Sequence, residues 1–306
     1  MLASAIAAAT LAWTSLPPAT LERAEVGAAR VGGAIYVVGG VGDGNRGPRV
    51  VERYDIRARS WRRVRPMPEP LHHCVAVAYD GRLYVSGGYR GFGDLTETTR
   101  VLLRYDPKTN RWRRLPPAPT PRAAHAAAVI RGRLYVAGGA NDTGSLRSLE
   151  VYDFARRRWR SGPDFRGPAR NHTTGVASGG LFYVLGGRAT VNFAAAERYD
   201  PRRRRWTRLP DMRNPRGGIA SARLADGRIV VFGGEDFGGS GDDTIREVEL
   251  FNPRSRRWRR LPDMRTPRHG LGGAALGNRV FAIEGGPRAM FSFSDVIEFI
   301  DVPRAR

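Results

Sequence analysis

Hydrophobic positions in this chain fall into short runs, and turn-forming residues separate one run from the next. Residues 72–115 show the arrangement. The β-prone run 72–79 is followed by Asp80-Gly81, a pair typical of tight hairpin turns. Three further runs follow, with a turn rich in breaking residues before the last; they span 82–86, 100–105 and 111–115. No helical periodicity appears, so the pattern predicts four short antiparallel strands.

Two markers repeat along the chain at the same spacing as this four-strand unit. A Gly-Gly pair follows a short apolar run six times, at intervals of 47 to 52 residues, and the six tryptophans keep the same interval. Self-similarity at about 50 residues with these markers predicts propeller blades. The glycine pairs are Gly39-Gly40, Gly87-Gly88, Gly138-Gly139, Gly186-Gly187, Gly233-Gly234 and Gly285-Gly286. The tryptophans are Trp13, Trp61, Trp112, Trp159, Trp206 and Trp258.

The pattern resembles the kelch repeat family over residues 13–302. The matching features are the glycine pair, the Trp of the fourth strand and a Tyr-Asp that closes the third strand. The fifth and sixth units depart from it, with Phe251-Asn252 and Ile300-Asp301. The resemblance implies an all-β, six-bladed kelch-type β-propeller with four antiparallel strands per blade. Propellers include both binding modules and enzymes, so the fold alone does not decide the function. The Tyr-Asp pairs are Tyr54-Asp55, Tyr105-Asp106, Tyr152-Asp153 and Tyr199-Asp200.

The two ends of the chain predict how the ring closes. The last unit lacks a Trp, whereas residues 11–16 form an orphan fourth strand that ends at Pro17-Pro18. We therefore expect the N-terminal strand to complete the C-terminal blade, which leaves no open edge in the ring. We expect one domain over 13–302, an apolar lead-in over 1–12 and a tail over 303–306.

Arginines recur at the start of the innermost strand, on the face that also carries the loops after the glycine pairs. Histidines stand beside them. A ring of guanidinium groups suits a carboxylate or phosphate ligand. The resemblance implies the same role, because kelch domains that capture acidic peptides use arginines here and directly after a glycine pair. The alternative is that these residues belong to the general repeat pattern. The candidate ligand-binding residues are Arg122, Arg170, Arg188, Arg216, Arg268, His73, His125, His172 and His269; Arg23 is a candidate equivalent, and the second unit has Leu71.

We predict a binding module that recognises a protein segment or a small anionic ligand on this loop face. Phenylalanines in the long loops, at 92, 193, 237, 291 and 293, suit an interface. One alternative is an enzyme acting on a carboxylated sugar, similar to the sialic-acid epimerases of the fold. A copper radical oxidase fits poorly, because Cys74 has no marked Tyr partner. The remaining alternative is a structural scaffold without chemistry.

We expect no cofactor and no metal. The histidines come from different blades, whereas metal ligands must converge on one ion. The acidic, Gly-rich loop 235–243 does not follow calcium-loop spacing. Cys74 is the single cysteine, so no disulfide forms within the chain, and we expect it to be a small buried hydrophobe. We expect a monomer.

The formal net charge of +22 comes almost entirely from arginine, since Lys108 is the single lysine. The arginines cluster around the turn between the third and fourth strands, where charge on an outer edge discourages aggregation. The other interpretation is polyanion binding, and we expect no specific nucleic-acid recognition. The apolar start is too short to span a bilayer, and it resembles the core of a secretory signal without the basic segment. We expect an exported protein; a cytoplasmic one is the alternative.

Overall fold

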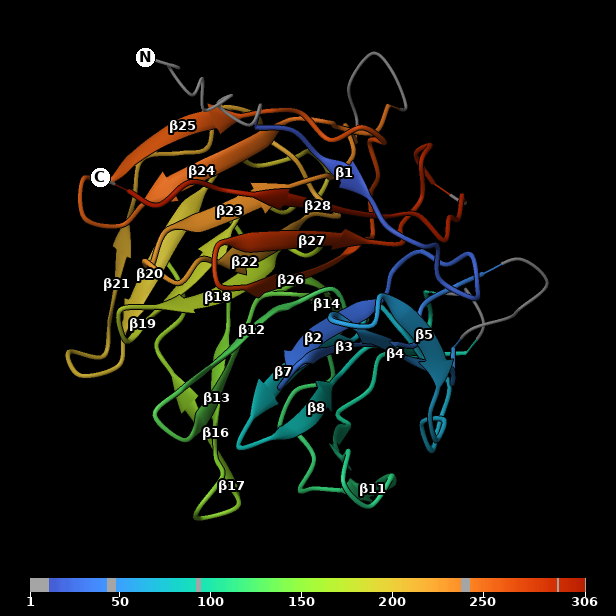
Figure 1. Cartoon of the computed structure of the whole chain (residues 1–306). Coiled ribbons are helices and arrows are strands. Elements are labelled where there is room, and N and C mark those ends of the chain that lie inside the picture. Colours follow the sequence, from blue (N-terminus) through green and yellow to red (C-terminus); the bar gives the residue numbers. More distant parts are fainter. Residues whose placement is uncertain (1–10, 43–47, 92–94, 238–242, 291, 306) are drawn as a thin grey trace, which may run out of the picture.

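The computed structural model describes residues 11–42, 48–91, 95–237, 243–290 and 292–305, and these form a six-bladed β-propeller (Figure 1). Each blade is an antiparallel sheet of four strands, and no helix occurs among the described residues. The predicted fold class is confirmed. Since the described part contains no helix, it offers none that is long and apolar enough to span a membrane.

The innermost strands of the six blades contact one another around a central channel. They are β2 (Gly27–Val31), β7 (Val75–Tyr79), β12 (Ala126–Ile130), β18 (Thr174–Ser178), β22 (Ala220–Arg223) and β26 (Gly272–Leu276). The second strands are β3 (Ala34–Val38), β8 (Arg82–Ser86), β13 (Arg133–Ala137), β19 (Leu181–Leu185), β23 (Ile229–Phe232) and β27 (Arg279–Ile283).

The third strands are β4 (Val51–Asp55), β10 (Leu102–Asp106), β16 (Leu149–Asp153), β20 (Ala196–Asp200), β24 (Val248–Asn252) and β28 (Ile297–Asp301). The outermost strands are β5 (Ser60–Arg63), β11 (Arg111–Arg114), β17 (Arg158–Gly162), β21 (Arg205–Arg208), β25 (Arg257–Leu261) and β1 (Thr14–Ser15). Two small ladders lie in the connections: β6 (Leu71–His72) pairs with β9 (Tyr89–Arg90), and β14 (Ala140–Asn141) with β15 (Gly144–Ser145).

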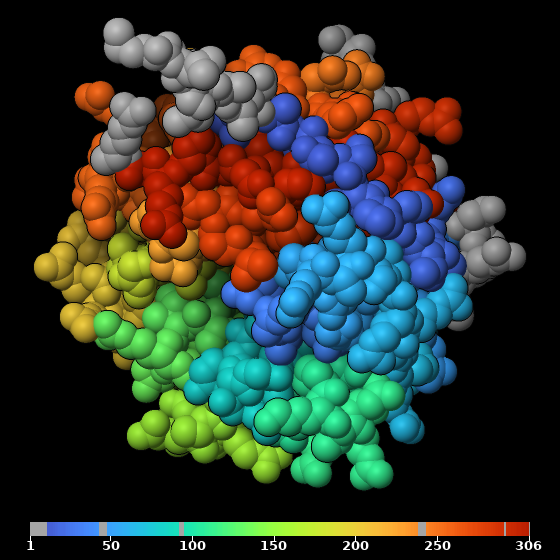
Figure 2. All heavy atoms as spheres, in the orientation of Figure 1, coloured from blue at the N-terminus to red at the C-terminus, as the bar shows by residue number. Residues whose placement is uncertain are grey.

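The N-terminal strand closes the ring. In β1, Thr14 pairs with Phe299 and Ser15 with Glu298 of β28. Figure 2 shows the atoms of the blue N-terminal segment packed directly against those of the red C-terminal part of the chain. The indole Nε1 of Trp13 also donates to the carbonyl of Pro262, 2.9 Å away, at the end of blade 5. The predicted closure is confirmed, although β1 is shorter than the predicted strand 11–16.

The tryptophans tie neighbouring blades together. Each Nε1–H reaches a backbone carbonyl of the preceding blade, as when Trp206 donates to Pro163 at 2.7 Å. In blades 1 to 5 the indole also lies against the aromatic residue of the third strand, with Tyr199 and Trp206 ring centroids 5.2 Å apart. A large ring that packs on the blade while its one polar atom is hydrogen-bonded to the preceding blade explains why Trp marks this position. The other donor–acceptor pairs are Trp13–Pro262, Trp61–Pro17, Trp112–Arg65, Trp159–Pro116 and Trp258–Pro210.

The glycine pair is required where the second strand of one blade passes the next blade. At Gly87, φ is +56°, and a Cβ would lie 2.3 Å from the carbonyl oxygen of Arg122. Any side chain is therefore excluded by the backbone of the neighbour. In blade 6 the pair is displaced by one residue, because Glu284, with φ of +54°, occupies the first position and Gly285 the second. The sequence alignment of Gly285-Gly286 with the other pairs was wrong by one position.

Candidate functional site at the channel mouth

Six residues, each two positions before an innermost strand, form a ring around one end of the channel. All six have a left-handed backbone with φ between +48° and +67°. This conformation turns the amide toward the preceding blade: His73 N donates to Glu25 O at 3.0 Å, and Ala124 N to His73 O at 2.9 Å. It also explains why the predicted strand 72–79 begins only at Val75. The members of this inner ring, in blade order, are Glu25, His73, Ala124, His172, Gly218 and Gly270.

A second ring surrounds the first. Its members follow the glycine pair of each blade and bridge to the residue that precedes the inner ring, as Arg188 does with Asn171 and Glu235 with Gly217. The face predicted to carry both sets of loops is therefore the face that holds the site. The outer ring consists of Val41, Tyr89, Ala140, Arg188, Glu235 and Gly286.

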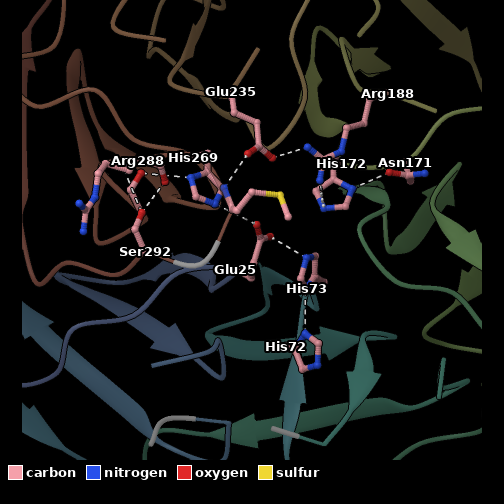
Figure 3. Close-up of polar contacts among 12 residues, drawn as sticks. Glu25, His72, His73, Asn171, His172, Arg188, Glu235, His269, Arg288 and Ser292 are labelled. Atoms are coloured by element: carbon pink, nitrogen blue, oxygen red, sulfur yellow. Dashed lines mark hydrogen bonds and ion pairs between the residues drawn. The ribbon is translucent and has the colours of Figure 1, made fainter. Parts of the chain in front are cut away.

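Three side chains of the inner ring converge over the channel (Figure 3). The Nε2 atom of His73 lies 3.2 Å from a carboxylate oxygen of Glu25. The rings of His73 and His172 meet edge to face, with centroids 5.0 Å apart. Behind them, His73 Nδ1 lies 2.7 Å from His72 Nδ1, and His172 Nδ1 donates to Asn171 Oδ1 at 2.5 Å.

Arg188 joins the two rings. Its guanidinium forms an ion pair with Glu235 and lies 4.4 Å from the centroid of the Phe237 ring. Its Nη2 atom also donates to His172 Nε2 at 3.1 Å. Because His172 Nδ1 donates to Asn171, Nε2 is the unprotonated nitrogen that accepts this bond.

His269, which belongs to blade 6, is the third histidine that lines the mouth. Its Nδ1 lies 3.1 Å from the carbonyl of Gly286, and its Nε2 lies 3.9 Å from Glu25 Oε1. The glycine at position 270 makes room for that carboxylate, since a Cβ there would lie 2.6 Å from Glu25 Oε1. A glycine in this ring position is thus needed for the acidic residue of blade 1 to reach the channel axis.

Burial keeps the histidines of the inner ring neutral. Desolvation, with the nearby positive charge of Arg188, lowers the pKa of His73 to about 3. The same causes hold the pKa of His172 well below its usual value. The imidazoles of His73 and His172 are therefore uncharged at neutral pH.

Above these groups lies a cavity of about 100 Å³, bordered by apolar loop residues such as Leu95, Met290 and Phe293. Below them the channel encloses about 390 Å³ and is lined largely by Ala, Gly and Val.

Five large hydrophobic residues are exposed in the described part of the chain, and four of them lie in loops of this face. Those four are Leu95, Val191, Phe237 and Met290. Of the loop aromatics expected here, Phe193 and Phe293 are partly buried, while Phe92, Phe291 and loop residues 238–242 lie outside the described residues.

Four of the five candidate arginines do not face the cavity. Arg122, Arg170, Arg216 and Arg268 are almost fully buried within their own blades. Each pairs with a glutamate at the second position of the third strand, as Arg170 does with Glu197 at 3.1 Å. Their assignment as ligand anchors is corrected: these side chains hold the blade together. The other pairs are Arg23–Glu52, Arg122–Glu150, Arg216–Glu249 and Arg268–Glu298.

His125 is also displaced from the predicted site. It stands one position after the inner ring, where Ala124 takes the mouth position, and its Nε2 lies 2.9 Å from Ser86 Oγ in the core. Burial lowers the pKa of His125 to about 3. His73, His172, His269 and Arg188 remain at the mouth. Cys74 is buried as expected, and burial raises the pKa of its thiol to about 12.

Coming from different blades does not keep the metal-ligating side chains apart, contrary to the expectation from sequence. Glu25, His73 and His172 come from three blades, yet their ligand atoms all lie within 4.8 Å of one another. Glu25 and Glu235 also lie at the mouth, although the sequence did not indicate them as ligand-binding candidates. The innermost strands begin two residues after Glu25, His73 and His172, whereas the predicted strand 72–79 already included His73, so the common level of the three residues was not recognised.

Comparison with known proteins agrees with this architecture. Residues 25–234 match the family described as the "KLHDC2/KLHL20/DRC7 Kelch-repeats domain", and residues 220–265 match the "Kelch motif". A solved structure titled "Structure of YjhT" superposes with a TM-score of 0.80 over 94% of this chain and 97% of that chain, at 18% identity. The six-bladed fold and these matches define the class of protein as a kelch propeller. The chain belongs to the kelch-repeat family.

The curated relatives match over part of the chain. Kelch-like protein 34 of Homo sapiens is 35% identical over 126 residues, which is 40% of this chain and 20% of that protein. Kelch-like protein terF of Aspergillus terreus is 32% identical over 139 residues, which is 42% of this chain and 30% of that protein. The aligned part is thus less than a third of these relatives' length. Kelch domains generally bind other proteins.

Proposed function

We propose that this propeller is a protein-interaction module whose loop face binds an extended segment of a partner protein. The observation that carries the proposal is the apolar border of the mouth. Leu95 and Met290 are more than half exposed and line the cavity, and Phe237 lies beside it on Arg188. Exposed apolar side chains gathered at a concave polar site are typical of interaction surfaces.

A protein segment is supported better than a small anionic ligand. Four of the five proposed arginine anchors are buried in their blades, and the fifth, Arg188, is already neutralised by Glu235. Glu25 adds a further negative charge at the mouth. A partner that inserts an apolar side chain among the loop residues and hydrogen-bonds to the polar residues of the inner ring fits this distribution.

An acid–base enzyme is the second candidate, because carboxylates and imidazoles converge in one pocket. One property weighs against it. A general acid or base works best with a pKa near the working pH, whereas the pKa of His73 is lowered to about 3.

The proposal is tested by selecting binders from a random displayed-peptide library on the immobilised protein. Enriched peptides are then measured by calorimetry against Phe237→Ser and Met290→Ser. The matched control is Leu276→Ser, because Leu276 is a comparably exposed hydrophobic residue at the β26–β27 hairpin, away from the mouth. Loss of about 1–3 kcal/mol of binding free energy in the two mouth variants alone supports the proposal. No enrichment, or binding lowered by Leu276→Ser alone, contradicts it.

A further inference from the structure

We propose that Glu25, His73 and His172 form a binding site for a divalent transition-metal ion, with Zn²⁺ as the best match. Two imidazoles and one carboxylate are a ligand set that Zn²⁺ accepts, with a fourth position left for water or an external ligand. The three ligand atoms lie within 4.8 Å of one another, on three different blades. The propeller thus assembles at its axis a set that no single blade contains.

The distances are compatible with one ion. Zn–N and Zn–O bonds of about 2.0–2.2 Å place tetrahedral ligand atoms about 3.4 Å apart. Glu25 Oε2 and His73 Nε2 are already 3.2 Å apart. The third ligand, His172, therefore needs to approach them by little more than about 1 Å. Ala124 stands between the two histidines in the inner ring, and its short side chain leaves space for their rings to meet at 5.0 Å.

The surrounding hydrogen bonds already orient the ligands. Metal-bound histidines usually donate the other ring N–H to a neighbouring acceptor, which fixes the tautomer. His172 does so through Nδ1 to Asn171 Oδ1, which leaves Nε2 free of a proton and directed to the axis. At His73, Nδ1 lies against His72 Nδ1 and Nε2 faces Glu25, so the ring already presents Nε2 to the site.

Arg188 must break one hydrogen bond when the ion binds. Its guanidinium donates to His172 Nε2, the atom that would bind the ion. Arg188 keeps two other partners, because it pairs with Glu235 and lies on the Phe237 ring. Ion binding therefore costs one hydrogen bond rather than the whole set of contacts. The fourth coordination position opens toward the cavity of about 100 Å³, which has room for water.

The test uses untagged full-length protein stripped with a chelator and titrated with Zn²⁺ by calorimetry. We expect one Zn²⁺ per chain, and a fall in affinity of about tenfold or more in Glu25→Gln, His73→Asn and His172→Asn. The matched control is His125→Asn, which removes a buried histidine outside the inner ring and should bind Zn²⁺ like the natural protein. Circular dichroism checks that each variant is folded.

A spectroscopic measurement on the unaltered protein keeps the test independent of variant folding. Co²⁺ at a four-coordinate His₂Glu site gives intense visible absorption, and added Zn²⁺ should abolish it by displacement. The proposal is overturned if the natural protein gives no such absorption and no calorimetric binding. Binding that is undiminished in all three folded ligand variants, or that is lost in His125→Asn, also overturns it.

Discussion

Arg188 and Glu235 occupy the same repeat position in neighbouring blades, directly after the glycine pair, and their side chains form an ion pair across the blade boundary. Two copies of one structural position thus carry opposite charges that neutralise each other. The Glu235 side chain is almost fully buried, and that of Arg188 is 15% exposed. The pair fixes the guanidinium beside His172 and leaves the mouth without a free cation among its described ring residues.

This relationship predicts a measurable coupling between blades 4 and 5. We expect a double-mutant cycle of Arg188→Ala and Glu235→Ala, followed by chemical denaturation, to give a coupling free energy of about 1–3 kcal/mol. Each single change leaves a largely buried charge without its partner, so the double variant should be less destabilised than the sum. Strict additivity would show that the contact contributes nothing.

Removing one member of the buried Arg170–Glu197 pair should destabilise the protein strongly, whereas replacing both residues together should not. We expect Arg170→Leu alone to lower the free energy of unfolding by about 3–5 kcal/mol, because it leaves the glutamate buried and unpaired. Blade 2 carries Leu71 and Leu103 at the same two positions, and both lie in one apolar cluster. The double change Arg170→Leu with Glu197→Leu should therefore regain most of the loss. Equal stability of the single and double variants in denaturation would refute this.

Closure of the ring should depend on Trp13. Removing residues 1–18 deletes β1 and exposes the edge of β28, so we expect a sharply lower melting temperature. Trp13→Ala leaves a cavity at a buried site and should lower the free energy of unfolding by about 3–5 kcal/mol. Trp13→Phe keeps most of the apolar contact and loses the bond to Pro262, so it should cost clearly less. A truncated protein that melts at the same temperature as the natural one would contradict the closure.

Glu284 should make stability depend on pH at the seam between blades 6 and 1. Burial, together with the nearby Glu52 carboxylate, outweighs Arg23 and raises the pKa of Glu284 to about 7. The folded state therefore holds this proton more tightly than the unfolded chain, whose glutamates titrate near about 4.3. The resulting stabilisation is complete below that lower value and disappears as the pH rises through about 7.

The measurement compares denaturation of the natural protein with that of Glu284→Gln between about pH 4 and pH 8. Glutamine cannot ionise, so we expect the stability of the variant relative to the natural protein to increase with pH across this range. Other titrating groups, including His125, contribute equally to both proteins and cancel. A relative stability that decreases with pH would mean that Arg23 favours the carboxylate over the acid.

The arginines of the outer edges should bind nucleic acid only as a diffuse positive surface. Those of the turn before β21, such as Arg203 and Arg204, are exposed. We expect any binding of duplex DNA to weaken steeply with salt and to ignore sequence, because phosphate contacts and counterion release supply the affinity. Fluorescence anisotropy with two unrelated duplexes at several salt concentrations tests this. Sequence-selective binding at physiological salt would contradict it.

The propeller, the number of its blades and the closure of its ring could all be predicted from the amino-acid sequence. These follow from local signals that recur in every repeat: the glycine pair, the Trp of the outer strand and short β-prone runs between turns. Each signal reflects a requirement within a blade or between adjacent blades, such as the backbone approach at Gly87 or the Trp206 bond to Pro163. The orphan strand around Trp13 carried the same information for the closure.

Which polar residues face the cavity could not be predicted from sequence, because it depends on how the blades pack together. Arg170 and His172 are two residues apart, yet Arg170 is buried inside its blade whereas His172, with its left-handed backbone, lies at the axis. A shift of one position likewise removed His125 from the mouth. The convergence of Glu25, His73 and His172 depends on bringing together three blades that are distant in sequence. The distances between these three side chains cannot be predicted from the composition or spacing of one repeat, because they are set when the ring closes.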